Sequence, residues 1–129
     1  MKKQQFGAGI WHFATYVDRY ATDGYGEPRS VLNAIELAGK VRDLSVVDIN
    51  YPYFGGNFTH EDLKAALDKA GLGVIGITPE IYTREFRKGA FTNPDSGIRR
   101  RAHELITESC EAVRFFNASY VKLWPGQDG

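Results

Sequence analysis

The chain has 129 residues, the size of one ordinary domain, and its 16 basic residues balance 16 acidic ones, so its formal net charge is zero. This balance argues against a nucleic-acid binder, which normally carries a basic surplus. Apolar residues make up 43% of the chain, as in a folded globular protein, and no apolar run approaches the roughly 18 residues of a membrane span.

The N-terminal residues and the single cysteine indicate the compartment. The initial Met-Lys-Lys is followed by Gln4 and Gln5 instead of an apolar segment, so we expect no secretory signal. Cys110 has no second cysteine with which to form an internal disulfide, which fits a reducing compartment. We therefore expect a cytoplasmic protein with neither a nucleic-acid nor a membrane partner.

In the first half of the chain, short apolar runs alternate with segments of helical period. Phe6 to Phe13 is apolar and punctuated by glycine, which predicts a first strand. Apolar residues near helical spacing predict a helix from Ser30 to Val41. Leu44 to Tyr51 is rich in β-branched residues and bounded by turn residues, which predicts a second strand.

The second half repeats this alternation. Thr59, with Asp62 three residues later, nearly matches a capping box and predicts a helix that ends before Gly71. The remaining predicted elements are a strand from Val74 to Ile81, a long helix that begins at Asp95 or Ser96, and a strand from Tyr120 to Trp124.

This order of elements predicts an α/β fold with parallel strands and right-handed crossovers. Two architectures fit, an open doubly wound sheet or part of a (β/α)₈ barrel. A complete barrel needs roughly 250 residues, and the chain stops just past a strand with no helix to cover it. We therefore expect residues 1–129 to form one (βα)₃β unit, the N-terminal half of a TIM barrel truncated after strand four.

The predicted strand-to-helix loops are long, whereas the helix-to-strand loops are short, and most aromatic residues fall at strand ends or in the long loops. Aromatic rings with carboxylate and amide neighbours suit a polyhydroxylated ligand, because its C–H faces pack on rings while its hydroxyl groups form hydrogen bonds. The alternative is that these rings fill loops or an oligomer interface.

Individual polar residues allow two interpretations each. His12 is either a base or ligand or a structural residue, because only one of His12 and its neighbour Trp11 can point into a barrel. Glu80, at the C-terminal end of a strand, is a functional candidate. Asp48 lies deeper in its strand and is either functional or the ion-pair partner of Lys122.

Other polar residues are expected at the surface. His60 and His103 lie on polar helix faces and are predicted to be solvated. The run Arg99–Arg101 is either solvated or paired with a partner chain or the missing half. No dinucleotide-binding, P-loop, CxxC, HExxH or nucleophile-elbow motif is found in the sequence.

Four segments resemble the xylose isomerase-like TIM barrels, and the third, which contains KGAFTNPD, is the most specific. These segments are Phe6–Trp11, Val46–Asn50, Phe86–Arg100 and Tyr120–Trp124. The resemblance covers almost the whole chain but only the first half of a family member. The family interconverts aldoses and ketoses, or epimerises keto-sugars, with divalent metal ions bound by Glu, Asp and His.

The resemblance assigns sugar-site walls to Trp11 and Trp124, with Leu123 as an alternative to Trp124. It also places Ile81, beside Tyr82, where the family has an aromatic wall residue. The metal ligands of the family come from strands five to eight, outside this chain.

The main departure from the family lies at Asn50, where xylose isomerases have a histidine that handles the sugar ring oxygen. An asparagine forms hydrogen bonds but does not shuttle a proton near neutral pH, which favours a relative with another sugar.

We therefore expect part of a metal-dependent sugar isomerase, inactive by itself, with Mg²⁺ or Mn²⁺ held elsewhere in the full-length enzyme. No catalytic residue is assigned, and the expected substrate-binding residues are Trp11, His12, Asn50, Glu80 and Trp124. The alternatives are a keto-sugar epimerase, a non-catalytic half-barrel that self-associates, and a metal-dependent DNA-repair endonuclease, which the neutral charge disfavours. The resemblance also implies a homo-oligomer, because the first long loop of xylose isomerases reaches a neighbouring subunit.

Overall fold

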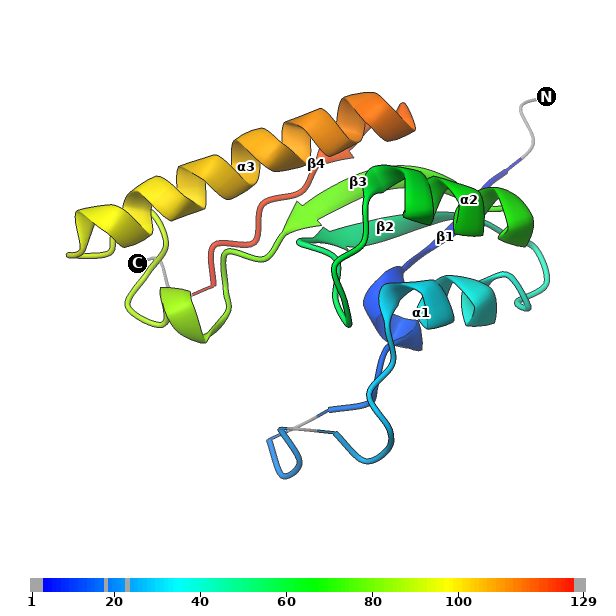
Figure 1. The fold of residues 1–129 in the computed structure, drawn as a ribbon, viewed down its shortest axis with the longest axis horizontal. Coiled ribbons are helices and arrows are strands. Elements are labelled where there is room, and N and C mark those ends of the chain that lie inside the picture. Colours follow the sequence, from blue (N-terminus) through cyan, green and yellow to red (C-terminus); the bar gives the residue numbers. More distant parts are fainter. Residues whose placement is uncertain (1–3, 18, 23, 127–129) are drawn as a thin grey trace.

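The structure, a computed structural model, describes residues 4–17, 19–22 and 24–126 (Figure 1). Its elements in chain order are β1 (Phe6–Gly9), the 3₁₀ turn η1 (Ile10–Phe13), α1 (Val31–Ala38), β2 (Leu44–Tyr51), α2 (His60–Ala70), β3 (Gly73–Pro79), the 3₁₀ turn η2 (Arg84–Phe86), α3 (Ser96–Phe116) and β4 (Tyr120–Val121). Within these ranges, no helix is long and apolar enough to span a bilayer.

The strands form one parallel sheet in the order β1-β2-β3-β4, which confirms the predicted α/β class and strand direction. Each strand lies beside its neighbour in sequence. A doubly wound sheet would instead reverse its strand order and carry helices on both faces. The observed order is compatible with half of a TIM barrel.

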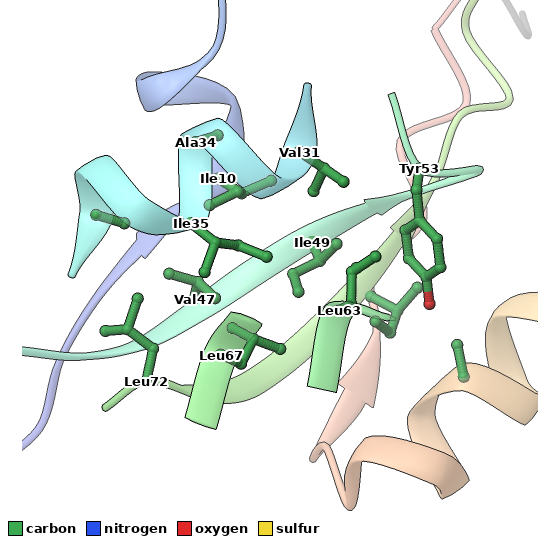
Figure 2. Packing of buried hydrophobic residues seen from close by; sticks show 13 residues of the cluster. Ile10, Val31, Ala34, Ile35, Val47, Ile49, Tyr53, Leu63, Leu67 and Leu72 are labelled. Carbon is green, nitrogen blue, oxygen red and sulfur yellow. The ribbon is translucent and has the colours of Figure 1, made fainter. Parts of the chain in front are cut away.

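A single buried cluster lies between the helices and one face of the sheet (Figure 2). β2 contributes Val47 and Ile49 from alternate positions, and β3 contributes Ile77, as the pleat of a strand requires. The helix residues of the cluster come from all three helices: Val31, Ala34, Ile35, Ala38, Leu63, Leu67 and Ala112. The helices therefore share one core on one side of the sheet.

The predicted caps of α2 are confirmed. The Thr59 hydroxyl accepts a hydrogen bond from the Asp62 N–H at 3.1 Å, and the Asp62 carboxylate accepts one from the Thr59 N–H at 2.8 Å. Gly71, with φ of +70°, ends the helix in the left-handed conformation that glycine adopts most readily. The predicted β2 has the bounds observed.

Two predicted strands are longer than the strands observed. The first ends at Gly9 instead of Phe13, because the 3₁₀ turn that follows buries Ile10 in the core. The fourth pairs only through Tyr120 and Val121, although the Lys122 N–H still donates to the Ile77 carbonyl at 2.9 Å. Pro125 lies three residues after Lys122 and has no N–H, so it cannot donate a further hydrogen bond to β3.

Two further boundaries also differ from prediction. α1 ends at Ala38 instead of Val41, and β3 ends at Pro79 instead of Ile81. Ile81 leaves the sheet because it is buried in a second cluster between the loop after β3 and α3. The other buried members of this cluster are Phe86, Ala90, Ala102 and Leu105.

The loop between η1 and α1 projects away from the rest of the molecule (Figure 1). Its two ends are joined because the Arg29 N–H donates to the Thr15 hydroxyl at 2.8 Å. Within the loop, the rings of Tyr16 and Tyr25 lie 5.5 Å apart and are largely exposed.

Candidate functional site

One row of residues crosses the sheet on the face opposite the helices. Gly9 of β1 is level with Asp48 of β2, which is level with Gly76 of β3, which in turn is level with Tyr120 of β4. A Cβ atom added at Gly9 would lie 2.1 Å from the Trp11 ring, and one added at Gly76 would lie 2.1 Å from the Tyr120 ring. The two glycines therefore leave room for two aromatic rings beside Asp48.

Asp48 is buried in the middle of this row, and both of its carboxylate oxygens have partners. The Thr78 hydroxyl donates to Oδ1 at 2.6 Å, the Tyr120 hydroxyl donates to Oδ2 at 3.1 Å, and the Lys122 ammonium lies 3.3 Å from Oδ2. A buried carboxylate is costly without such partners. The sequence left Asp48 either functional or paired with Lys122, and the ion pair is observed.

Lys122 connects this network to η1, the turn that follows β1. Its Nζ lies 4.3 Å from the centroid of the Trp11 ring, within the range of a cation–π contact. The Lys122 side chain is 39% exposed, whereas that of Asp48 is 7% exposed. The ammonium is therefore the more exposed member of the ion pair.

A cavity of about 470 Å³ lies at the C-terminal ends of the strands. Its lining consists of Trp11, Asn50, Thr78, Tyr82, Lys122, Trp124 and Gly126. A second cavity of about 440 Å³ lies deeper along the same sheet face and shares Trp11 and Lys122 with the first. Volumes of this size are typical of small-molecule sites, and the strand ends are where ligands bind in parallel α/β folds.

Asn50 and Tyr82 form a polar pair in the wall of this cavity. The Asn50 amide donates to the Tyr82 hydroxyl at 2.8 Å, and Asn50 is almost fully buried. Burial, followed by the charge of Glu80, raises the pKa of Tyr82 to about 12, although the Asn50 hydrogen bond acts in the opposite direction. Tyr82 therefore keeps its proton at neutral pH and can donate a hydrogen bond to a ligand.

The structure brings three of the five predicted substrate-binding residues to one cavity, namely Trp11, Asn50 and Trp124. Leu123, the alternative to Trp124, does not line it. His12 does not line it either, and its exposed ring lies 5.8 Å from that of Trp11. Sugar binding by these residues remains a prediction.

Glu80 stands apart from this cavity. It follows β3, its N–H donates to the Tyr51 carbonyl at 2.8 Å, and it is absent from the cavity lining. Its side chain is half-buried, and this burial raises the pKa of the carboxyl group. The charge of Glu80 contributes to the raised pKa of Tyr82.

Four lining residues were not predicted as site residues: Thr78, Tyr82, Lys122 and Gly126. Thr78 and Lys122 lie on the same sheet face as Asn50, but recognising this requires the register between β2, β3 and β4. The available signal for Tyr82 was its place beside Ile81, where the family resemblance expects an aromatic wall. Because Ile81 is buried in the second cluster, Tyr82 supplies the aromatic ring.

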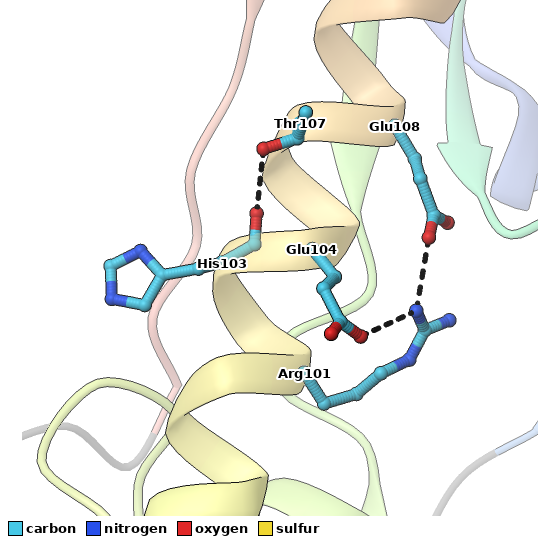
Figure 3. Close-up of polar contacts among 5 residues, drawn as sticks. All are labelled: Arg101, His103, Glu104, Thr107 and Glu108. Atoms are coloured by element: carbon cyan, nitrogen blue, oxygen red, sulfur yellow. Dashed lines mark hydrogen bonds and ion pairs between the residues drawn. The ribbon is translucent and has the colours of Figure 1, made fainter.

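The arginine run at the start of α3 is paired within the chain. Arg101 lies 3.5 Å from the Glu104 carboxylate and 3.0 Å from that of Glu108, one and two turns further along the helix (Figure 3). Arg99 donates to the Asn93 carbonyl at 2.6 Å. These contacts hold the beginning of α3 to its own later turns and to the preceding loop. Arg100 is exposed, which agrees with the alternative that this run is solvated.

His60 is not solvated as predicted, because it faces the C-terminal end of α3. Its Nδ1 lies 2.7 Å from the Tyr53 hydroxyl, and its ring lies 5.2 Å from that of Phe115. Tyr53 is buried, which raises the pKa of its hydroxyl group, and His60 supplies its polar partner. His103 (Figure 3) is exposed, as predicted. The centroid of its ring lies 5.5 Å from that of Phe91.

The donors of this cavity do not fit a divalent metal ion. Asp48 is the buried carboxylate closest to the lining, and it is already bound to an ammonium and two hydroxyl groups. Divalent cations such as Mg²⁺ need free oxygen ligands, and the adjacent Lys122 charge opposes a cation. Across the part of the chain that the structure describes, no three His, Cys, Asp or Glu residues are grouped to hold a metal.

No family model matches the chain. The chain is similar to the xylose isomerase of Thermus thermophilus, with 26% identity over 146 residues. This match covers 98% of the chain but 35% of the relative, so the chain spans about a third of the length of that protein. The similarity indicates at most a xylose isomerase-like relationship.

Proposed function

We propose that this chain forms the first four strands and the sugar-binding face of a xylose isomerase-like sugar isomerase. The observation that carries the proposal is the convergence of Trp11, Asn50 and Trp124 on one cavity at the strand ends. These residues are about 40 positions or more apart in sequence. Similarity to a xylose isomerase along 98% of the chain supports the same assignment.

The residues of the cavity have distinct roles in this proposal. Trp11 and Trp124 provide apolar surfaces for the C–H faces of a sugar ring. Asn50, Tyr82 and Lys122 provide hydrogen-bonding groups for its hydroxyl and carbonyl oxygens. Contacts with Asp48 hold the Thr78 hydroxyl, the Tyr120 hydroxyl and the Lys122 ammonium in place on this face of the sheet.

The metal ion of the reaction is assigned to residues outside this chain. The family resemblance implies Mg²⁺ or Mn²⁺, and the donors around Asp48 do not fit either ion. We therefore propose that further βα units, covering the same sheet face, carry the metal ligands. The 129-residue chain alone is then expected to bind sugar without converting it.

The test joins this chain to the portion of the T. thermophilus xylose isomerase that follows the region of similarity. Aldose–ketose interconversion is measured with added Mg²⁺ or Mn²⁺, for the hybrid and for the chain alone. We expect turnover by the hybrid only. We also expect Trp124→Ala to abolish it and Phe115→Ala, a change at an exposed aromatic on α3, to leave it intact.

Three results would change this conclusion. Keto-sugar epimerisation by the hybrid, without aldose–ketose conversion, would favour the epimerase alternative. A hybrid that melts cooperatively but neither binds nor converts sugars contradicts the proposal. Isomerisation by the 129-residue chain alone contradicts the assignment of the metal ligands to other residues.

A second candidate function is a non-catalytic half-barrel that self-associates. Two exposed apolar residues favour it, Phe6 on β1 at one edge of the sheet and Leu123 just after β4 at the other. Exposed strand edges pair readily with another chain, and a two-fold axis would join β1 of one copy to β4 of the next. Sedimentation equilibrium, combined with thermal melting and sugar titration, separates the two candidates. A stable dimer that melts cooperatively and binds no sugar favours the self-associating half-barrel.

A further inference from the structure

We propose that the sugar bound in this cavity carries an anionic group, a carboxylate or a phosphate, and that Lys122 binds it. This inference rests on the proposed sugar-binding function and specifies its substrate class. Among the described residues that line the cavity, Lys122 is the one with a formal charge. The remaining lining is aromatic, amide or hydroxyl in character, apart from Gly126.

The position of the Lys122 ammonium is fixed on two sides. It lies 3.3 Å from Asp48 Oδ2 and 4.3 Å from the centroid of the Trp11 ring. An ammonium has three donors, and these contacts use only part of its hydrogen-bonding capacity. With its side chain 39% exposed, Lys122 presents the rest to the cavity.

Asp48 does not cancel the positive character of the site toward a ligand. Its oxygens also accept hydrogen bonds from Thr78 at 2.6 Å and from Tyr120 at 3.1 Å, both shorter than the 3.3 Å to Lys122. The carboxylate is buried and lines the second cavity but not this one, whereas Lys122 lines both. Asp48 therefore acts as a positioning residue for the Lys122 charge.

A second donor supports an anionic ligand. The Tyr82 hydroxyl keeps its proton because its pKa is raised to about 12, so it donates to an oxygen and does not serve as a base. Glu80 is the carboxylate with the largest electrostatic effect on the pKa of Tyr82, and it does not line the cavity. Lys122 and Tyr82 thus both place hydrogen-bond donors in the same cavity.

A charge-assisted hydrogen bond is roughly twice as strong as a neutral one. A neutral sugar replaces water at Lys122 with a hydroxyl group, whereas a sugar acid or sugar phosphate replaces it with a full negative charge. We therefore expect the anionic sugar to bind about tenfold more tightly than its neutral counterpart. Added salt should reduce this preference because it screens the partly exposed charge.

The fluorescence of the chain reports on this cavity directly. The sequence has two tryptophans, Trp11 and Trp124, and both line the cavity. Tryptophan emission is therefore titrated with D-xylose and D-xylose 5-phosphate, with D-glucose and D-glucuronate, and with inorganic phosphate. The two sugar pairs distinguish a phosphate from a carboxylate as the group bound.

Three variants test whether the positive charge of Lys122 causes the preference for an anionic sugar. Lys122→Met should remove the preference for the anionic sugar, and Lys122→Arg should retain it. Lys64→Met, at an exposed position on α2, is the matched control and should leave it unchanged. Thermal melting of each variant identifies any that fails to fold. If Lys122→Met does not fold, the proposal is decided by whether Lys122→Arg retains the preference for the anionic sugar.

Each remaining outcome has one meaning. Equal or tighter binding of the neutral sugars overturns the anionic class but leaves the proposed sugar-binding function standing. A failure of every sugar to bind overturns both. Inorganic phosphate that binds as tightly as the sugar phosphate, and equally in Lys122→Met, also overturns the proposal.

Discussion

Asp48 is the residue on which the polar network of the sheet depends. It holds Thr78, Tyr120 and Lys122 together across three strands. Asp48→Ala leaves the buried Thr78 hydroxyl and the partly exposed Tyr120 hydroxyl without this acceptor and frees Lys122 from its partner. We expect this change to lower the free energy of unfolding by about 3 kcal/mol, measured by urea denaturation.

The matched control for Asp48 is Asp68, which pairs with Lys64 on the exposed surface of α2. Both of those side chains are at least half exposed, so solvent screens their attraction. Asp68→Ala should therefore cost about 0.5 kcal/mol or less. Equal losses in the two variants would show that the buried network contributes nothing beyond a surface pair.

Glu80 gives the protein a pH-dependent stability term. Burial raises the pKa of its carboxyl group in the folded state above the ordinary value of 4.5, so the folded state holds this proton more tightly than the unfolded state. As the pH rises from 4.5 through the folded-state pKa, this group increasingly destabilises the folded state, and the penalty is fully present above that pKa.

Glu80→Gln removes that penalty. We expect the variant to melt at a higher temperature than the unmodified chain at pH 7, with the difference shrinking as the pH falls through the folded-state pKa toward 4.5. Melting curves recorded by circular dichroism at several pH values measure it. A difference that does not change with pH would contradict the assignment to this carboxyl group.

Among the elements, β3 is shaped by its glycine at position 76. The Tyr120 ring lies where a Cβ at Gly76 would be, 2.1 Å from the nearest ring atom. Gly76→Ala must therefore displace Tyr120 and its hydrogen bond to Asp48. We expect a loss of about 2 kcal/mol in the free energy of unfolding, measured by urea denaturation.

Gly73, on the same strand, provides the control for this change. A Cβ at Gly73 would meet its nearest neighbour, Val46, at 3.5 Å, which is ordinary van der Waals contact. Gly73→Ala should therefore change stability far less than Gly76→Ala. In the background of Tyr120→Ala, the cost of Gly76→Ala should disappear; persistence of that cost would rule out the ring as its cause.

The elements could be predicted from sequence where local chemistry decides them. Turn residues delimit β2, and the capping residues Thr59 and Asp62 delimit α2. The first strand was predicted too long because an apolar run cannot distinguish a strand from the 3₁₀ turn that buries Ile10. The fourth strand was predicted too long for a similar reason, since Trp124 is apolar but contributes to the cavity instead of the sheet.

The candidate site was predictable only in part. The family resemblance identified Trp11, Asn50 and Trp124, which meet at one cavity. The roles of Thr78 and Lys122 depend on which residues face each other across the sheet, and this register is set by long-range packing. Local sequence patterns hold no such information.

For the whole molecule, the two exposed edges of the sheet are where we expect any self-association to occur. Phe6 is 55% exposed at one edge and Leu123 is 50% exposed at the other. If these edges join copies of the chain, Phe6→Lys and Leu123→Lys should weaken self-association, measured by sedimentation equilibrium. Val41→Lys, at a similarly exposed apolar residue between α1 and β2, should leave it unchanged. Equal effects of all three changes would indicate unspecific aggregation.

The partners of Asp48 impose an order on folding. Thr78 lies 30 residues after Asp48 in sequence, and Tyr120 lies 72 residues after it. Contacts across such distances form late, because closing a long loop costs entropy before the contact can form. We therefore expect the carboxylate to acquire its full set of partners only when β4 joins the sheet, and the cavity at the strand ends to be completed late in folding.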